Sequence, residues 1–174
     1  MKQSLLILFC LVLSACAGNE NPRGNSSNQT ANAQKTSQPK PAEAMTFSAE
    51  KMQIEAGNSG EAILKLKIQP PFHVNSNPPS EDNLIPTTIE FESKNGLTFE
   101  KPNYPVGELK KFQFSEKPLL IYEGEIEIKL PVKADAKAAK GEQTVSGKLR
   151  FQPCDEEVCY RPQTVDVVLP IEIS

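Results

Sequence analysis

The sequence has 174 residues, of which 38% are hydrophobic and 24% charged, and its formal net charge at pH 7 is −3. It contains no Trp, one His and four Cys, and it has neither a glycine-rich phosphate loop nor a patch of basic residues interleaved with aromatic ones. These features argue against nucleotide chemistry and against binding to nucleic acid. We therefore expect no cofactor and no nucleic-acid partner.

The N-terminal segment has the features of an export signal. A positive start is followed by an apolar run at 4–13, which is too short to cross a bilayer as a helix. The run ends in Leu-Ser-Ala directly before Cys16, which resembles the lipobox of bacterial lipoproteins. The resemblance implies a lipoprotein signal peptide at 1–15 and diacylglycerol on the Cys16 sulfur. The alternative is an ordinary secretory signal that is cleaved near Ala17.

A lipidated Cys16 would anchor the mature chain to a membrane without spanning it. Ala17 in place of Asp matches the outer-membrane sorting pattern of Gram-negative lipoproteins, so we expect a lipid-anchored periplasmic protein on the outer membrane. Residues 16–44 hold the lipidated Cys and then mainly Asn, Ser, Gln, Pro, Lys and Ala, a composition that predicts a flexible linker. The r.m.s. reach of such a linker is on the order of 30 Å.

Residues 45–174 have the length of one domain and show the two-residue alternation of half-buried strands. The clearest alternating runs are 62–68, 87–92, 125–130, 145–151 and 165–173, and weaker strands are expected at 46–54, 97–99 and 120–122. Turn residues separate these runs, and no long amphipathic helix is predicted. Seven or more short strands at this spacing predict an all-β fold, an immunoglobulin-like antiparallel β-sandwich.

Cysteine arithmetic leaves one pair in the mature protein. Cys10 is removed with the signal and Cys16 is lipidated, so Cys154 and Cys159 remain, in a compartment that permits disulfides. The four residues between them are enough for a hairpin in which the two sulfur atoms meet. As a staple, the bond would close a loop of about six residues and stabilise the fold by about 2 kcal/mol. The residues alone leave a redox pair and a local structural disulfide equally open.

Two prolines flank the cysteine pair. The apolar positions of the run that ends at Phe151 are odd-numbered, so continued alternation would place Cys154 on the solvent face. Pro153 interrupts that strand, however, and Pro162 interrupts the start of the next one. We therefore expect a rigid, irregular connection between two paired strands at one end of the sandwich.

Asp155, Glu156 and Glu157 lie between the two cysteines. Nearby negative charge disfavours a thiolate, so we expect thiol pKa values not far below the ordinary range, although the acids can equally well solvate a turn. A zinc site would have to recruit the distant His73 and a carboxylate such as Asp155, which makes it the weaker alternative, and we expect no metal. His73 itself is expected to be an ordinary loop or strand-end residue.

Four segments, taken in order, are similar to the N-terminal periplasmic domain of the thiol:disulfide interchange protein DsbD. They are Phe-His-Val-Asn-Ser-Asn at 72–77, Leu-Ile-Pro-Thr at 84–87, Tyr-Pro-Val-Gly at 104–107 and the cysteine-containing segment 151–162. The resemblance covers roughly 45–174 and implies an immunoglobulin-like sandwich whose cysteine pair alternates between dithiol and disulfide. It further implies that Cys159 forms the mixed disulfide with a partner and that Cys154 resolves it.

In this family a mobile cap loop with an aromatic residue covers the cysteine pair. The resemblance points to 107–115 as the corresponding segment, with Phe112 or Phe114 as the capping residue. Plain core packing is the alternative for both phenylalanines.

The resemblance also implies partners. The DsbD domain takes electrons from a thioredoxin-like domain and passes them to periplasmic proteins that reduce wrong disulfides or keep apocytochrome thiols reduced, as in cytochrome c biogenesis. In DsbD the chain continues into membrane helices and a thioredoxin-like domain, whereas this sequence ends at Ser174, directly after its last predicted strand. We therefore expect the donor, a thioredoxin-like protein or a membrane thiol reductant, on a separate chain. The alternative is a non-catalytic binding module with a permanent bond between Cys154 and Cys159.

Overall fold

The computed structural model describes residues 40–174, so the predicted signal peptide, Cys16 and nearly all of the predicted linker lie outside the described residues. The described part is all-β, as predicted, with one short 3-10 helix at its start. The elements are η1 (Pro41–Glu43), β1 (Met45–Ala49), β2 (Met52–Ile54), β3 (Ser59–Ile68), β4 (His73–Asn75), β5 (Thr88–Phe91), β6 (Leu97–Phe99), β7 (Glu108–Lys110), β8 (Leu119–Tyr122), β9 (Glu125–Ala134), β10 (Gly141–Phe151), β11 (Pro153–Cys154) and β12 (Gln163–Ile173). Within residues 40–174, no helix has the length and apolar character needed to cross a membrane.

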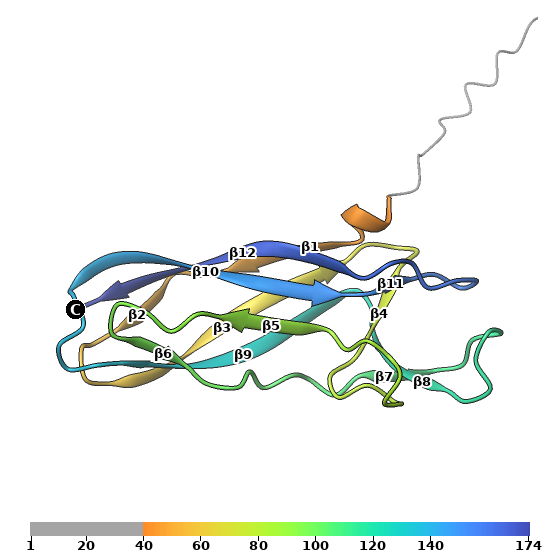
Figure 1. Cartoon of the computed structure of the whole chain (residues 1–174), viewed down its shortest axis with the longest axis horizontal. Coiled ribbons are helices and arrows are strands. Elements are labelled where there is room, and N and C mark those ends of the chain that lie inside the picture. The colour runs from red at the N-terminus through yellow and green to blue at the C-terminus, as the bar shows by residue number, and fades with distance from the viewer. Residues whose placement is uncertain (1–39) are drawn as a thin grey trace, which may run out of the picture. The chain divides into compact units, whose positions relative to one another are not determined.

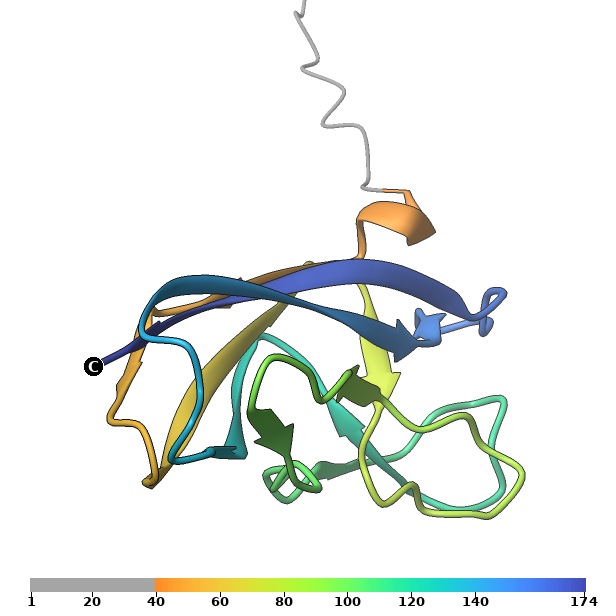
Figure 2. The same ribbon diagram turned by 60° about the vertical axis from the view of Figure 1, so that its left-hand side comes forward.

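The strands form three four-stranded sheets, in the orders β1-β3-β9-β6, β2-β12-β10-β5 and β11-β4-β8-β7. The first two sheets are the layers of an immunoglobulin-like β-sandwich, which we call the body (Figure 1, Figure 2). All pairings are antiparallel except that of β12 with β2. The third sheet lies at the end of the sandwich away from the C-terminus, and we call it the site sheet (Figure 1).

The body is built on the alternation that the sequence predicts. From Ala62 onward in β3 and from Val167 onward in β12, every second side chain is buried and those between are exposed or half-buried, because each sheet has one face on the core. The inward side chains of the two layers form a single apolar cluster that contains, among others, Ala62, Leu64, Leu66, Ile128, Leu130, Val145, Leu149, Val167, Leu169 and Ile171. Burial of this surface is the main term that holds the two layers together.

One predicted strand is wrong. The expected strand at 46–54 is split into β1, which pairs with β3 in one layer, and β2, which runs parallel to β12 in the other layer. The chain crosses between the layers at the exposed residues Glu50 and Lys51. After the crossing, the Lys51 ammonium lies 2.7 Å from the carboxylate of Glu142 and 3.2 Å from that of Glu172 on the second layer, and these exposed pairs stabilise the crossing only slightly.

Strands β4, β8 and β11 of the site sheet are covered on both faces, unlike the body strands, whereas its edge strand β7 is largely exposed. All three residues of β4 are buried, and β8 has three buried residues out of four. On one face, Val74 and Tyr122 join the main core. On the other face lies a separate apolar cluster, the outer cluster, which consists of Phe112, Leu119, Ile121 and the half-buried Leu84. Strands that are covered on both sides show no alternation, which explains the weak sequence signal for β4.

Buried polar groups tie the site sheet to the loop between β4 and β5. The Asn75 side-chain amide donates a 3.1 Å hydrogen bond to the carbonyl of Ile85, and the Thr87 hydroxyl donates one of 2.8 Å to the carbonyl of Asn75. The Ser76 hydroxyl donates to the carbonyl of Pro78 over 2.7 Å. The polar residues of this segment therefore satisfy loop carbonyls that packing would otherwise leave without partners.

Candidate functional site

The cysteine segment connects the two longest paired strands. β10 and β12 pair from Gly141 opposite Ile173 to Phe151 opposite Gln163, so their connection lies at the end of the sandwich away from Ile173. This position agrees with the predicted connection at one end of the sandwich. Figure 1 shows the connection beside the site sheet, which it joins through β11.

Cys154 is fully buried, with 0% of its surface exposed. After Phe151 the chain leaves the β10 sheet, and β11 pairs instead with β4, placing Pro153 opposite Val74 and Cys154 opposite His73. Continued alternation from β10 would have placed Cys154 on the solvent face. The change of sheet at Pro153 reverses that outcome, because β11 is covered on both faces.

Cys154 and Cys159 form a disulfide, with an S–S distance of 2.00 Å and a Cα–Cα distance of 4.0 Å. The two residues also pair as an isolated antiparallel bridge, so the segment between them is a tight hairpin. Cys159 is partly exposed, whereas Cys154 is not. A partner that approaches from solvent therefore reaches Cys159 first.

Asp155 organises the turn of this hairpin. Its Oδ1 accepts hydrogen bonds of 2.9 Å from the backbone N–H groups of Glu157 and Val158, and its Oδ2 accepts one of 2.6 Å from the Tyr160 hydroxyl. The bond from Tyr160, helped by the backbone donors, holds the pKa of Asp155 below its ordinary value. The same bond raises the pKa of Tyr160. Asp155 is thus a structural residue of the turn.

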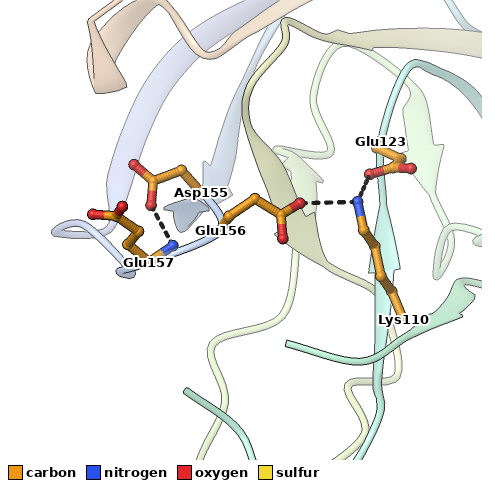
Figure 3. A network of polar contacts seen from close by, with 5 residues as sticks. All are labelled: Lys110, Glu123, Asp155, Glu156 and Glu157. Carbon is orange, nitrogen blue, oxygen red and sulfur yellow. Dashed lines mark hydrogen bonds and ion pairs between the residues drawn. The ribbon is translucent and has the colours of Figure 1, made fainter. Parts of the chain in front are cut away.

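Lys110 joins the site sheet to the hairpin. Its ammonium lies 3.0 Å from the carboxylate of Glu123 and 3.3 Å from that of Glu156, and Figure 3 shows it between the two. The hydrogen bond to Glu123 raises the pKa of Lys110, and the contact with Glu156 adds to the effect. Since all three side chains are more than a third exposed, solvent screens these pairs and each stabilises the fold only slightly.

The segment 107–115, in which we expected a cap loop, contains a strand. Residues 108–110 form β7 and pair with β8, and only the residues after Lys110 leave the sheet. Gly107 allows this close approach, because a Cβ atom there would lie 2.6 Å from the Cβ of Ser76. The first part of the candidate cap segment is therefore a strand, and the cap assignment itself stays a prediction.

The two candidate capping residues lie in different environments. Phe112 is 2% exposed and stacks on the His73 ring, with centroids 4.2 Å apart and an interplanar angle of 18°. Phe114 is 42% exposed and stacks on the outer side of Phe112, at 5.2 Å. Phe112 therefore contacts the residue that pairs with Cys154, whereas Phe114 contacts Phe112.

His73 has a more central place than the sequence indicated. It begins β4, as a strand-end residue, but it is 2% exposed and pairs directly with Cys154. Burial lowers its pKa, and the nearby Lys110 lowers it further. Only the β11–β4 pairing brings the two residues together, and no local pattern in the sequence contains that pairing. Among residues 40–174, no cluster of three or more His, Cys, Asp or Glu side chains is arranged to hold a metal ion.

The family model described as "Thiol:disulfide interchange protein DsbD, N-terminal" matches residues 26–170. Among the curated proteins, none matches the chain.

Three solved structures contain chains to which this chain is similar. A type I cohesin–dockerin complex from Clostridium thermocellum contains a chain with 12% identity, 75% coverage of this chain, 94% coverage of that chain and a TM-score of 0.39. AggA, the major subunit of an Escherichia coli aggregative adherence fimbria, has 8% identity, 75% coverage of this chain, 94% coverage of that chain and a TM-score of 0.32. A family 123 glycoside hydrolase from Clostridium perfringens has 9% identity, 75% coverage of this chain, 27% coverage of that chain and a TM-score of 0.32. At these values none of the three contributes to the functional argument.

Proposed function

The chain belongs to the DsbD N-terminal family of periplasmic thiol:disulfide interchange domains, and from this premise we propose that Cys154 and Cys159 relay electrons between a thioredoxin-like donor and envelope proteins. The observation that carries the proposal is the unequal exposure of the two cysteines. Cys159 is reachable from solvent and Cys154 is buried beneath it, which is the arrangement that a two-step exchange requires.

The exchange consists of two displacements. A donor thiolate attacks the Sγ of Cys159, the Cys154–Cys159 bond breaks, and its electron pair leaves on the Sγ of Cys154. The second thiol of the donor, as its thiolate, then attacks the donor sulfur of the mixed disulfide and releases the thiolate of Cys159. The donor is thereby oxidised to a disulfide, and the Cys154–Cys159 pair is reduced by two electrons and takes up two protons. With an oxidised client the same steps run in reverse: Cys159 attacks the client and Cys154 resolves the mixed disulfide.

The surface around the hairpin suits a protein partner. Five large apolar side chains are exposed in the described range, and four of them belong to the hairpin or to the segment that contains β7. The four are Val106, Leu109, Phe114 and Val158, with exposures of 91%, 68%, 42% and 48%. Apolar side chains gathered at one end of a soluble domain are typical of an interaction site.

We assign the cap to Phe112, with Phe114 as its outer neighbour. The stacking of Phe112 on His73 supports this assignment, because His73 is the residue that pairs with Cys154. Outward movement of this aromatic pair would uncover the neighbourhood of the disulfide for a docked partner and cover it again afterwards.

Trapping of mixed disulfides tests the relay. In a Cys154→Ala variant the resolving thiol is missing, so Cys159 should accumulate as a mixed disulfide with a thioredoxin-like protein of the same envelope. The adduct should disappear on reduction and should be absent from Cys159→Ala and from the double variant. If the Cys154→Ala variant yields no thioredoxin-like adduct, the relay is wrong.

The reduction potential separates the relay from a permanent staple. We expect the potential of the pair to lie within the range of exchange-active disulfides, above about −300 mV. Equilibration with defined thiol buffers, followed by alkylation of the free thiols, measures it directly. A value below about −300 mV would support the binding module with a structural Cys154–Cys159 bond.

Lipidation of Cys16 would place the relay at the surface of a membrane in the periplasm, and we propose the outer membrane on the basis of Ala17. A metabolic label carried by a fatty acid should enter the wild-type protein and not a Cys16→Ser variant. Separation of the inner and outer membranes then gives the location. Recovery of the unlabelled wild-type protein in the soluble periplasmic fraction would contradict the anchor.

A further inference from the structure

His73 differs from the other buried polar residues of the described chain. The buried polar residues of the described chain are His73, Asn75, Ser76 and Thr87. The side chains of the last three make the hydrogen bonds to loop carbonyls described above. The His73 imidazole makes none of these bonds, and its pKa is lowered by burial and by Lys110, with no hydrogen bond among the causes. Within residues 40–174 the His73 ring nitrogens are not among the buried atoms left without a partner, so the imidazole keeps access to a partner or to water and can exchange a proton.

The geometry places this imidazole beside the buried sulfur. Cys154 lies directly opposite His73 in the antiparallel pair of β11 and β4. Residues opposite each other project their side chains from the same face of the sheet, with Cβ atoms about 4.5–5.5 Å apart. Phe112 stacks on the imidazole ring and limits its freedom to turn away.

The charges around His73 suit a proton acceptor. Lys110 on β7 lowers the pKa of His73 in addition to burial, while Glu123 after β8 and the hairpin residues Asp155 and Glu156 raise it. Since the lowering effects are larger, the ring is neutral at neutral pH and free to take a proton. The three carboxylates then stabilise the imidazolium once it has formed.

We infer that His73 is the general base that takes the proton from the Cys154 thiol when Cys154 resolves the mixed disulfide on Cys159. The inference rests on the proposed exchange function and adds a residue to it. Cys154 needs such a base, because burial away from water disfavours its thiolate and raises the pKa of a thiol.

The step balances in atoms and electrons. The thiol of Cys154 gives its proton to the neutral imidazole, and its sulfur attacks the Sγ of Cys159. The bond between Cys159 and the client sulfur breaks, and the electron pair leaves on the client as a thiolate. The client sulfur is reduced, the cysteine pair is oxidised to its disulfide, and the proton on His73 passes to the client thiolate or to water.

The aromatic disulfide DTNB separates the two steps. With reduced protein and excess DTNB, attack by Cys159 releases the first thionitrobenzoate and depends on the DTNB concentration. Attack by Cys154 on the resulting mixed disulfide releases the second equivalent and is independent of that concentration. Stopped-flow absorbance therefore measures the resolving step on its own.

Two substitutions at His73 test the base. His73→Gln keeps a hydrogen-bonding side chain, and His73→Phe keeps an aromatic ring to stack on Phe112, but neither accepts a proton. In both we expect the second phase at pH 7 to slow by on the order of 10², the usual size of general-base effects. The first phase serves as an internal control for an intact site, and thermal unfolding checks that each variant is folded.

The pH dependence of the second phase gives a readout that a structural role would not change. In the wild type its rate should rise with pH through the lowered pKa of His73 and then level off. In both variants the rate should keep rising toward the pKa of the Cys154 thiol itself. Folded variants with wild-type second-phase rates and pH profiles would overturn the assignment alone. A wild-type protein that releases no second equivalent would overturn the exchange function and the assignment together.

Discussion

The body and the site sheet differ in their pattern of burial and in the polarity of their buried residues. Along β3 in the body, buried and outward positions alternate, whereas β4 in the site sheet is buried at every position. The buried polar residues of the described chain all lie in β4 or in the loop that follows it, and the body core is apolar. The comparison teaches that the region that holds the fold together and the region that holds the disulfide are largely separate. Substitutions in one should therefore leave the properties of the other unchanged.

The largest expected effect is on the body. Leu64→Ala removes a fully buried side chain from the main core and should lower the free energy of unfolding by about 2–5 kcal/mol. Urea denaturation measures the loss. At temperatures where the variant is folded, both DTNB phases should keep their wild-type rates. A change in those rates would show that the two regions are coupled.

Phe112→Leu should mainly change the reactivity of the disulfide and have a smaller effect on stability. It thins the cover over His73, so we expect several-fold faster reduction of the disulfide by a small thiol, together with a stability loss of about 1 kcal/mol. Phe99→Leu is the matched control, because Phe99 packs on Phe91 in the body. Equal acceleration in both variants would indicate general loosening and would argue against a cap.

His73 provides a pH signature of the site region. It is the only histidine in the sequence, so its single imidazole NMR resonance titrates without ambiguity, and we expect a midpoint below the ordinary value of 6.5. The unfolded state then binds the proton more readily than the folded state. The contribution of His73 to the free energy of unfolding should therefore be fully present above pH 6.5 and should be lost as the pH drops below it. In His73→Gln that decrease should disappear. A midpoint above 6.5 would contradict the burial argument.

Tyr160→Phe removes the hydroxyl that bonds to Asp155 in the hairpin. The pKa of Asp155 should rise toward its ordinary value, and a small part of the wild-type stability should be lost. In the wild type this contribution to the free energy of unfolding is present above the ordinary carboxyl pKa and is lost as the pH falls through the lowered pKa of Asp155. The free energy of unfolding of the variant should therefore decrease less steeply at acid pH. Tyr104→Phe is the control, since its hydroxyl accepts a hydrogen bond from the Ile89 backbone instead. It should leave the decrease at acid pH unchanged.

The smallest effect is expected at Lys110. Lys110→Met breaks the pairs with Glu123 and Glu156 and should cost at most about 1 kcal/mol, with the difference decreasing at high salt. Lys65→Met is the matched control, because Lys65 pairs with Glu50 and Glu127 in the body. Only the Lys110 variant should alter the DTNB rates. An equal change of these rates in both variants would show that the cause is the net charge of the protein.

The sequence predicts most of the body and only part of the site. The alternation at 62–68 and 165–173 is local, so the strands and their inward faces follow directly from it, and cysteine arithmetic isolates Cys154 and Cys159. The strand at 46–54 was predicted as one element where the structure has two, because nothing local marks a crossing between layers at two charged residues.

The site residues were harder to predict because their contacts are not local. Pro153 signals a break, but nothing in the sequence shows that β11 moves to the sheet that contains β4. The burial of Cys154 and its pairing with His73 both depend on that move. Two-sided burial also removes the alternation that would have marked 73–75 as a strand, so His73 gave no sign of its position.

The position of Ser174 has a practical consequence. The last residues of β12 lie at the opposite end of the sandwich from the disulfide hairpin (Figure 2). Attachment through Ser174 to a sensor chip would therefore hold every molecule in the same orientation, with the hairpin facing the flow. Binding of candidate donors and clients to the oxidised and the reduced protein could then be compared on one surface, without a linker next to the cysteines.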